Sequence, residues 1–337
     1  MVDRNVAIVG AAGAVGRKLL DILEERRFPV GGLTLMGTAR TAGTTMEFRG
    51  RSEPVELVEP ERFEGVHIAF FAVPTDVSLS LAPEAVRRGA VVIDKSNAFR
   101  ADPSVPLVVP EVNQEALSAH RGIIASPNCS TIQLVMALKP IEGLSRLTRV
   151  VVATYQSVSG TGWEAVEELR TQSRSILDGQ AVKPKVYPHP IAFNLIPHID
   201  EFEPGGHSKE EMKMVTETRK IMGRPDLAVS ATTVRVPVEV GHSEAVWVET
   251  RRPVSPEEAR EALAAMPGVL VRDDPAEGVY PTPLEAAGRD EVFVGRIRKD
   301  LSSERGLAFW VVSDNLRKGA ASNAVQIAEE LVKRGLC

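Results

Sequence analysis

Apolar and polar positions follow different patterns in the two parts of the chain. Up to about residue 128, short apolar runs alternate with amphipathic segments, the order of strands and helices in a doubly wound parallel sheet. The predicted strands are Val6–Val9, Leu33–Met36, Ile68–Val73, Val91–Asp94 and Gly122–Ala125. We therefore expect an α/β fold whose first domain spans residues 1–128.

The pattern changes after Pro140. Longer runs rich in β-branched residues follow, interrupted by a polar helical stretch from about 162 to 178. They predict strands at Arg149–Val158, Leu227–Val240, Glu244–Thr250, Val292–Arg298 and Leu307–Val312. The second domain, residues 129–315, should thus be α+β with a mostly antiparallel sheet. An amphipathic pattern predicts a last helix over 320–334, and we expect the segment 316–337 to return to the first domain.

Composition and charge exclude several classes of partner. The 337 residues suffice for about two domains, and the net charge of −5 favours neither nucleic acid nor an anionic membrane surface as a partner. No apolar run is long enough to span a membrane. Two cysteines, Cys129 and Cys337, make no disulfide framework, and six histidines show no metal-ligand spacing. With no signal-peptide pattern, we expect a cytoplasmic protein without a metal site.

A glycine-rich turn follows the first strand. Residues 10–16 read Gly-x-x-Gly-x-x-Gly, and an amphipathic helix comes next. Glycines there let the backbone approach a pyrophosphate at the helix N-terminus, so this segment predicts the first unit of a dinucleotide-binding fold. The alternative is a helix that simply packs close to the strand end. The candidate cofactor contacts are Gly10, Ala12, Gly13, Ala14, Val15 and Gly16.

The end of the second strand indicates which dinucleotide would bind. No Asp or Glu is present there to accept the ribose hydroxyl of NAD. Instead, Arg40 stands between the hydroxyl residues Thr38 and Thr41. A guanidinium suits a two-point grip on a 2′-phosphate, so we predict NADP as the cofactor. The alternative is a solvated loop arginine.

Cys129 lies between a predicted strand and a predicted helix. Residues 132–138 should form that helix, ending before Pro140, with Asn128 as its N-cap. Unpaired N–H groups and the helix dipole would favour a thiolate there and could hold a developing oxyanion. The pattern predicts an acyl-transfer nucleophile, against the alternative of a small buried hydrophobic residue.

Two further candidates lie in the second domain. Along the strand around Arg235, alternation places the arginine and Thr233 on the face opposite the valines, so Arg235 should face a polar surface or cleft. Seven residues later, past a turn at Gly241, comes His242. A single histidine can be a catalyst or a satisfied structural residue.

Nine parts of the sequence carry a resemblance to a known family: 10–16, 40–43, 97–100, 109–113, 127–131, 154–160, 210–213, Arg235 with His242, and 314–321. Taken together, they resemble the aspartate-β-semialdehyde dehydrogenase family over nearly the whole chain. The chain departs at Arg40-Thr41, where many members have Arg-Ser, and this change keeps the hydroxyl. The resemblance implies a Rossmann-like domain and a C-terminal dimerisation domain, in a homodimer that could pair into tetramers.

The resemblance also implies an activity and residue roles. The reaction would be NADPH-dependent reduction of L-aspartyl 4-phosphate to L-aspartate 4-semialdehyde, towards lysine, diaminopimelate, methionine, threonine and isoleucine. Cys129 would be the nucleophile, His242 the general acid and base, and Gln156 the residue that orients the acyl group. The implied ligand contacts are Arg235 for the α-carboxylate, Glu210 for the α-amino group, Asn97, Arg100 and Lys213 for the phosphate, and Ser159, Gly160 and Asn315 for the cofactor.

Three alternatives remain to be weighed. A short-chain dehydrogenase would need Tyr-x-x-x-Lys, which none of the three tyrosines begins. N-acetylglutamyl-phosphate reductase shares the fold and the cysteine chemistry. A non-catalytic nucleotide-binding paralogue would be expected to have lost the nucleophile, whereas Cys129, Gln156 and His242 are all present.

Overall fold

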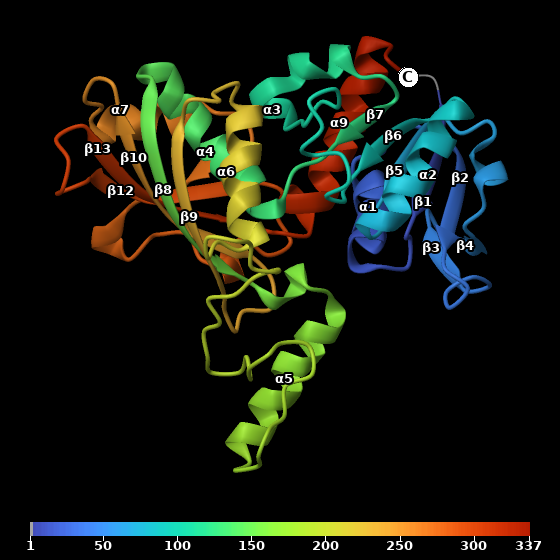
Figure 1. Cartoon of the computed structure of the whole chain (residues 1–337), viewed down its shortest axis with the longest axis horizontal. Helices are drawn as coiled ribbons and strands as arrows, with labels where there is room; N and C mark the ends of the chain where they lie inside the picture. The colour runs from blue at the N-terminus through green and yellow to red at the C-terminus, as the bar shows by residue number, and fades with distance from the viewer. Residues whose placement is uncertain (1–2) are drawn as a thin grey trace. The chain divides into compact units, whose positions relative to one another are not determined.

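The structure, a computed structural model, describes residues 3–337 and forms two compact units (Figure 1). The first unit holds the chain up to Asn128 together with Ala320–Cys337, and the second holds Cys129–Gly319. The division falls directly before Cys129. Each unit contains a β-sheet of its own.

The first unit contains a seven-stranded sheet. Its strands, in spatial order, are β3 (Thr45–Phe48), β4 (Arg51–Leu57), β2 (Val30–Gly37), β1 (Arg4–Val9), β5 (Ile68–Phe71), β6 (Val91–Asp94) and β7 (Ile123–Ala125). Neighbours run parallel except in the β3–β4 hairpin. All five predicted strands are present, although β5 ends at Phe71 rather than Val73. The pattern does not predict β3 and β4, because β3 alternates polar and apolar residues over only four positions and β4 is mostly polar and exposed.

Helices cover both faces of this sheet. On one face, α1 (Ala14–Glu25) and α9 (Ser322–Arg334) share a buried apolar cluster with the strands. On the other face, α2 (Thr75–Arg87) and the 3-10 turn η1 (Pro60–Phe63) contribute to a second cluster. The shorter elements α3 (Pro110–Asn113) and η2 (Gln114–Ala119) precede β7. This arrangement confirms the doubly wound α/β prediction.

A six-stranded mixed sheet forms the centre of the second unit. Its strands, in spatial order, are β11 (Val269–Val271), β12 (Val292–Lys299), β13 (Gly306–Ser313), β10 (His242–Thr250), β8 (Leu147–Gln156) and β9 (Ala228–Arg235). The three inner pairings are antiparallel and the two edge pairings are parallel, so the sheet is mostly antiparallel, as predicted. β9 ends at Arg235, short of the predicted Val240. The three-residue β11 is not among the predicted strands.

The central helix of this unit is α4 (Cys129–Leu144), which packs against the sheet and against α6 (Lys209–Ile221) and α7 (Pro256–Ala264). The prediction that it ends before Pro140 is wrong, because the helix continues through Pro140 to Leu144. A proline removes one helical hydrogen bond, but burial of nearly every residue from Ser130 to Leu138 holds the helix in place.

The remaining helical elements follow in chain order, and the last of them runs from the second unit into the first. They are η3 (Val158–Gly160), α5 (Trp163–Leu177), η4 (Pro275–Glu277), α8 (Pro283–Ala286) and the π-helical turn η5 (Arg317–Ala321). α5 confirms the polar helix expected over 162–178; it projects away from the six-stranded sheet (Figure 1) and has a small apolar cluster of its own. η5 precedes α9, so the last α-helix begins at Ser322 rather than Ala320.

Candidate active site

Cys129 is the first residue of α4. Its side chain is partly exposed and in no disulfide, and Asn128 directly precedes the helix. The backbone of η5 passes close beside it, since a Cβ on Gly319 would lie 2.9 Å from the Cβ of Cys129. Only glycine allows this approach. The thiol thus lies at a helix N-terminus, where backbone N–H groups favour an anion.

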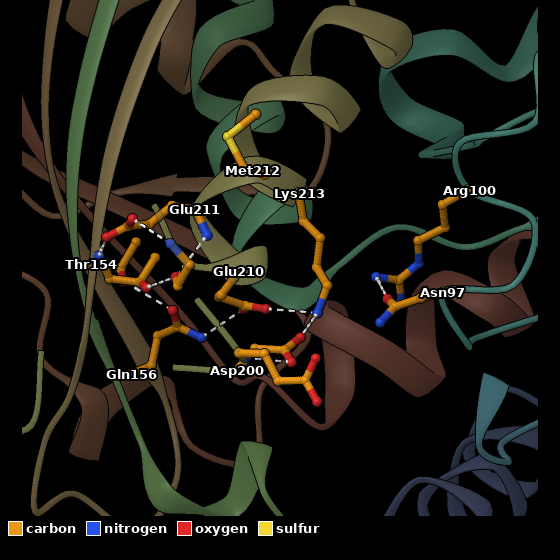
Figure 2. A network of polar contacts seen from close by, with 12 residues as sticks. Asn97, Arg100, Thr154, Gln156, Asp200, Glu210, Glu211, Met212 and Lys213 are labelled. Carbon is orange, nitrogen blue, oxygen red and sulfur yellow. Dashed lines mark hydrogen bonds and ion pairs between the residues drawn. The ribbon is translucent and has the colours of Figure 1, made fainter. Parts of the chain in front are cut away.

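Gln156, Glu210 and Lys213 belong to one chain of polar contacts (Figure 2). The Oε1 atom of Gln156 accepts a hydrogen bond from Thr154 at 2.9 Å, and its Nε2 donates to Glu210 at 3.0 Å. The second oxygen of Glu210 accepts from Lys213 at 3.2 Å, and Lys213 also donates to Asp200 at 2.6 Å. The end of β8 is therefore tied to the first turn of α6.

The charge of Lys213 is shared between two carboxylates. Burial acts to lower the pKa of Lys213, but Glu210 and Asp200 outweigh it, so the pKa is raised above its usual value. Lys213 therefore stays an ammonium group at neutral pH. Any anion that it binds competes with Glu210 and Asp200.

Arg235 and His242 both contact the backbone of Ser157. The Nη1 atom of Arg235 donates to the carbonyl oxygen of Ser157 at 2.7 Å, and its guanidinium lies 6.0 Å from the ring centre of Tyr187. Among the described residues, the Nε atom of Arg235 has no hydrogen-bond partner, although it is buried. Arg235 lies at a buried polar site, on the same side of β9 as Thr233.

His242 is completely buried at the start of β10. Its Nδ1 atom lies 3.1 Å from the peptide nitrogen of Ser157, which donates to it, and 3.0 Å from the Ser157 hydroxyl. Burial, and then the Arg235 charge, hold the pKa of His242 well below its usual range. A Cβ on Gly160 would lie 3.3 Å from Nε2 of His242 and 3.1 Å from Nη1 of Arg235, so Gly160 keeps this space open.

Ser159 and Asn315 form a second hydrogen-bonded group with Ser157. The Asn315 amide donates to Ser159 at 3.0 Å, and its oxygen accepts from the backbone of Gly241 at 2.9 Å and from the Ser157 hydroxyl at 3.0 Å. These hydrogen bonds use the oxygen and one N–H of the Asn315 side-chain amide. One N–H of this amide remains for a ligand.

A buried carboxyl lies on the same face of β10 as His242. Glu244 is fully buried opposite Thr154 of β8, and burial raises the pKa of Glu244 well above its usual range, although the Gln133 amide lowers it in part. Gln133 lies one turn after Cys129 on α4 and accepts a hydrogen bond from Ser313 at 2.6 Å. Burial therefore favours the protonated form of Glu244 in the folded chain.

The glycine-rich turn of the first unit is shaped by close packing. Gly10 has a φ of +85°, and a Cβ there would lie 2.3 Å from the carbonyl oxygen of Ala72. A Cβ on Gly16 would lie 2.3 Å from the oxygen of Gly10, whereas one on Gly13 would lie 3.3 Å from it. α1 begins at Ala14 with Gly13 as its N-cap residue. Close packing thus requires glycine at positions 10 and 16. Gly13 is exposed and less tightly packed, so the N-terminus of α1 is accessible there.

Arg40 lies at the tip of the turn after β2. The carbonyl of Thr38 accepts hydrogen bonds from the backbone of Thr41 at 2.9 Å and from its hydroxyl at 3.2 Å. Arg40 is exposed and makes no hydrogen bond or ion pair with any residue in the described range. This turn therefore presents a guanidinium for a ligand.

Arg100 is held by the loop that follows β6. It donates to Asn97 at 3.0 Å (Figure 2). It also donates to the carbonyl of Ser126 at 3.0 Å and to the carbonyl of Lys95 at 2.7 Å. The guanidinium is buried and Asn97 is exposed. These contacts orient Arg100 within the first unit.

Sequence analysis missed Ser157, Tyr187 and Asp200. Ser157 lies inside the segment 154–160, between residues already assigned roles, so its position was a usable signal. Tyr187 and Asp200 lie in the irregular segment between α5 and α6, where no periodic pattern or motif signals them.

Within residues 3–337, no cluster of three or more His, Cys, Asp or Glu side chains could hold a metal ion. No helix in this range is both long and apolar enough to cross a membrane.

The chain matches two family models and several known proteins. "Semialdehyde dehydrogenase, NAD binding domain" matches residues 5–120, and "Semialdehyde dehydrogenase, dimerisation domain" matches residues 138–318. The aspartate-semialdehyde dehydrogenase of Bacillus subtilis (strain 168) is 52% identical over 340 residues, 98% of each chain.

Solved structures agree with this match. A structure of aspartate semialdehyde dehydrogenase II from Vibrio cholerae complexed with ASA has a TM-score of 0.96 at 47% identity, covering 99% of both chains. One from Candida albicans with NADP has a TM-score of 0.78 at 25% identity, covering 99% of this chain and 100% of that one. With both parts of the chain matched and more than half of the aligned residues identical to a relative, the chain belongs to the aspartate-semialdehyde dehydrogenase family.

Proposed function

We propose that this chain reduces L-aspartyl 4-phosphate to L-aspartate 4-semialdehyde with NADPH, releasing phosphate, through a thioester on Cys129. The observation that carries the proposal is the placement of Cys129 at the start of a buried helix, in one unit with the polar groups around Gln156, Arg235 and His242. A charged substrate needs this combination of a nucleophile and convergent polar contacts.

The reaction would proceed in two steps at Cys129. The thiolate attacks the acyl carbon, the C–O bond to phosphate breaks, and a thioester forms. Bound NADPH supplies a hydride to the thioester carbon. The resulting alkoxide collapses to the aldehyde, and the electron pair of the C–S bond returns to the sulfur. Gln156, fixed by Thr154 and Glu210, would orient the acyl group.

The substrate contacts follow from charge and geometry. Arg235 offers its buried, unpartnered Nε–H and the neighbouring Nη2 as a planar fork for the α-carboxylate. Glu210 would receive the α-amino group. Asn97, Arg100 and Lys213 would bind the phosphate, and Lys213 would exchange part of its contact with Asp200 for it.

The proposed cofactor is NADP. The open helix N-terminus at Gly13 suits a pyrophosphate, and the exposed Arg40 suits the 2′-phosphate. Ser159, Gly160 and the remaining N–H of Asn315 would contact the cofactor from the second unit. We assign NADP binding to residues 1–128 with 316–337, and catalysis and dimerisation to 129–315.

We also propose a homodimer formed by the outer face of the six-stranded sheet, and tetramers remain an option. Small and aromatic side chains share this face, with Ala153, Ala245 and Trp310 directly opposite one another. Trp247 and Trp310 line a cavity of about 350 Å³ on it. A half-exposed apolar face of this kind is typical of an interface.

The proposed cellular compartment follows from the thiol chemistry of Cys129. A nucleophilic thiol needs a reducing compartment, so we propose a cytoplasmic enzyme of amino-acid biosynthesis, towards lysine, diaminopimelate, methionine, threonine and isoleucine.

The deciding experiment is phosphate-dependent reduction of NADP by aspartate semialdehyde. Parallel assays would use NAD, and N-acetylglutamate semialdehyde in place of the substrate. We expect turnover with NADP and aspartate semialdehyde to exceed both alternatives. Faster turnover of the N-acetylated substrate would instead support N-acetylglutamyl-phosphate reductase, and no turnover with either would support a non-catalytic paralogue.

A further inference from the structure

The projecting helix α5 carries a buried polar pair. Glu168 and Gln172 are only 9% and 3% exposed, and the Gln172 amide donates to one oxygen of Glu168 at 3.0 Å. The other oxygen of Glu168 accepts from the peptide nitrogens of Lys185 and Val186, at 3.0 and 2.7 Å. Burying a carboxyl group is costly unless hydrogen bonds satisfy it, and these donors do so.

Gln172 holds the next part of the same segment. Its side-chain oxygen accepts from the peptide nitrogens of Ile191 and Ala192, at 2.9 and 3.2 Å. The segment 185–192 belongs to no helix or strand, so its backbone N–H groups need other acceptors. Two side chains of α5 thus fix both ends of this segment.

Tyr187 lies between the two fixed ends. Its hydroxyl donates to the Thr161 hydroxyl at 2.9 Å, and its ring centre lies 6.0 Å from the guanidinium carbon of Arg235. The side chain also packs against the apolar cluster of α5. Burial raises the pKa of Tyr187, although the Arg235 charge lowers it in part, so the phenol stays a hydrogen-bond donor at neutral pH. These contacts fix the ring beside Arg235.

The plane of the Arg235 guanidinium needs such a neighbour. Its Nη1 atom donates to the carbonyl of Ser157, and its buried Nε atom has no hydrogen-bond partner among residues 3–337. A hydrogen bond at one nitrogen does not by itself hold the plane, whereas a two-point contact with a carboxylate requires a fixed plane. An aromatic ring beside a guanidinium attracts it and restricts its rotation.

We propose that Tyr187 is a positioning residue for the Arg235 guanidinium, and that Glu168 and Gln172 hold Tyr187 in place. The ring keeps the planar fork of Arg235 turned towards the substrate α-carboxylate. This inference rests on the proposed function, because the α-carboxylate is the ligand proposed there for Arg235.

The first test measures amide hydrogen exchange of the full chain without ligands. Glu168→Ala removes the acceptor of two peptide N–H groups, so exchange in the peptide that contains 185–192 should become at least about 10-fold faster. Glu168→Gln keeps one acceptor oxygen and should give a smaller increase. Glu167→Ala is the matched control, since its exposed side chain pairs with Arg170. Unchanged exchange in both Glu168 variants, or an equal increase in the control, would refute the role of Glu168.

The second test observes the Nε–H signal of Arg235 by ¹H–¹⁵N NMR, again without ligands, and Arg235→Lys identifies the signal. Tyr187→Leu removes the aromatic ring and should shift this signal more than Tyr187→Phe, which keeps the ring. Equal shifts in the two variants, or no shift in either, would show that the ring does not act on Arg235. Neither measurement needs turnover, so both decide the arrangement even if the proposed reaction fails.

The third test is kinetic. We expect Tyr187→Leu to raise KM for aspartate semialdehyde by about 3- to 30-fold, the range of a cation–aromatic contact, with kcat and the KM for phosphate changed less than about twofold. Tyr187→Phe should raise KM less. In an Arg235→Lys background, Tyr187→Leu should change KM less than about twofold, because the planar fork is already lost. Equal effects of Tyr187→Leu in both backgrounds, or a loss confined to kcat, would contradict action through Arg235.

Discussion

The glycine-rich turn of the first unit and the polar site of the second are built in opposite ways. The turn is one continuous segment, 10–16, and two of its glycines, Gly10 and Gly16, are required by backbone packing against Ala72 and Gly10. The polar site draws Gln156, Glu210 and Arg235 from three different elements and holds them by side-chain hydrogen bonds. The turn at residues 10–16 is therefore a local site, which depends on space for its backbone. The group of Gln156, Glu210 and Arg235 is a dispersed site, which depends on strand register and on each hydrogen-bond partner.

The largest effect should come from the nucleophile itself. We expect Cys129→Ala to lower kcat by at least about 10⁴-fold, because the covalent route is lost. Little buried volume is removed, so the melting temperature should stay near that of the wild type. Activity above a tenth of wild type, measured in the same assay, would remove covalent catalysis from the mechanism.

Substitution of Arg235 tests whether the substrate carboxylate and the phosphate bind to different residues, as proposed. Arg235→Lys keeps the charge and loses the planar fork, so kcat/KM for aspartate semialdehyde should fall by about 2–4 kcal/mol, roughly 30- to 1000-fold. Arg100→Ala and Lys213→Ala should instead raise KM mainly for phosphate. Lys209→Ala is the matched control, because Lys209 lies on the same helix in an exposed pair with Glu201. The reverse pattern of KM values would refute the substrate contacts.

The local site can be broken through its backbone. Gly10→Ala places a Cβ 2.3 Å from the oxygen of Ala72 at a positive φ, so we expect the free energy of unfolding to fall by about 2–3 kcal/mol. Gly13→Ala meets only one atom, at 3.3 Å, and should change stability by less than about 1 kcal/mol while raising KM for NADP. Denaturant unfolding and steady-state kinetics measure the two effects. Equal stability losses would mean that Gly13 is also a packing glycine.

Cofactor choice should depend on a single exposed side chain. Arg40→Ala should raise KM for NADP by roughly 10- to 30-fold, about 1.5–2 kcal/mol, and change KM for NAD little, because only NADP carries the 2′-phosphate. Arg51→Ala, at an exposed arginine of β4, is the control. Parallel losses for both cofactors would show that Arg40 only supports the turn.

The smallest effect concerns the buried carboxyl behind the dispersed site. The raised pKa of Glu244 means that the folded chain holds a proton that the unfolded chain releases above about pH 4.5. The contribution of Glu244 to the free energy of unfolding therefore falls as pH rises. Glu244→Gln cannot titrate and should raise the free energy of unfolding by about 1 kcal/mol at pH 8, with a smaller gain at pH 5. Glu249→Gln, on the same strand but paired with Arg149 at the surface, is the control. A gain that does not depend on pH would contradict the assignment.

Some features were open to sequence analysis for a clear reason. The strands β1, β2, β5, β6 and β7 are apolar runs between turn residues, so their own residues specify them. β3 and β4 contain no such apolar run, and their pairing depends on neighbouring strands. The local pattern is also insufficient at Pro140. The proline predicts the end of a helix, but α4 continues to Leu144 because most of its residues are buried.

The sequence by itself determined the α/β class, the order of the two sheets, the helix that begins at Cys129 and the family resemblance, because periodicity, turn residues and motifs are local. Only the tertiary structure decided that Lys213 shares its charge with Asp200, that Glu244 is buried with a raised pKa, and that Ser157 donates to His242. These relations join residues far apart in the chain. Their energies depend on burial and hydrogen-bond geometry, which arise only when strands and helices pack.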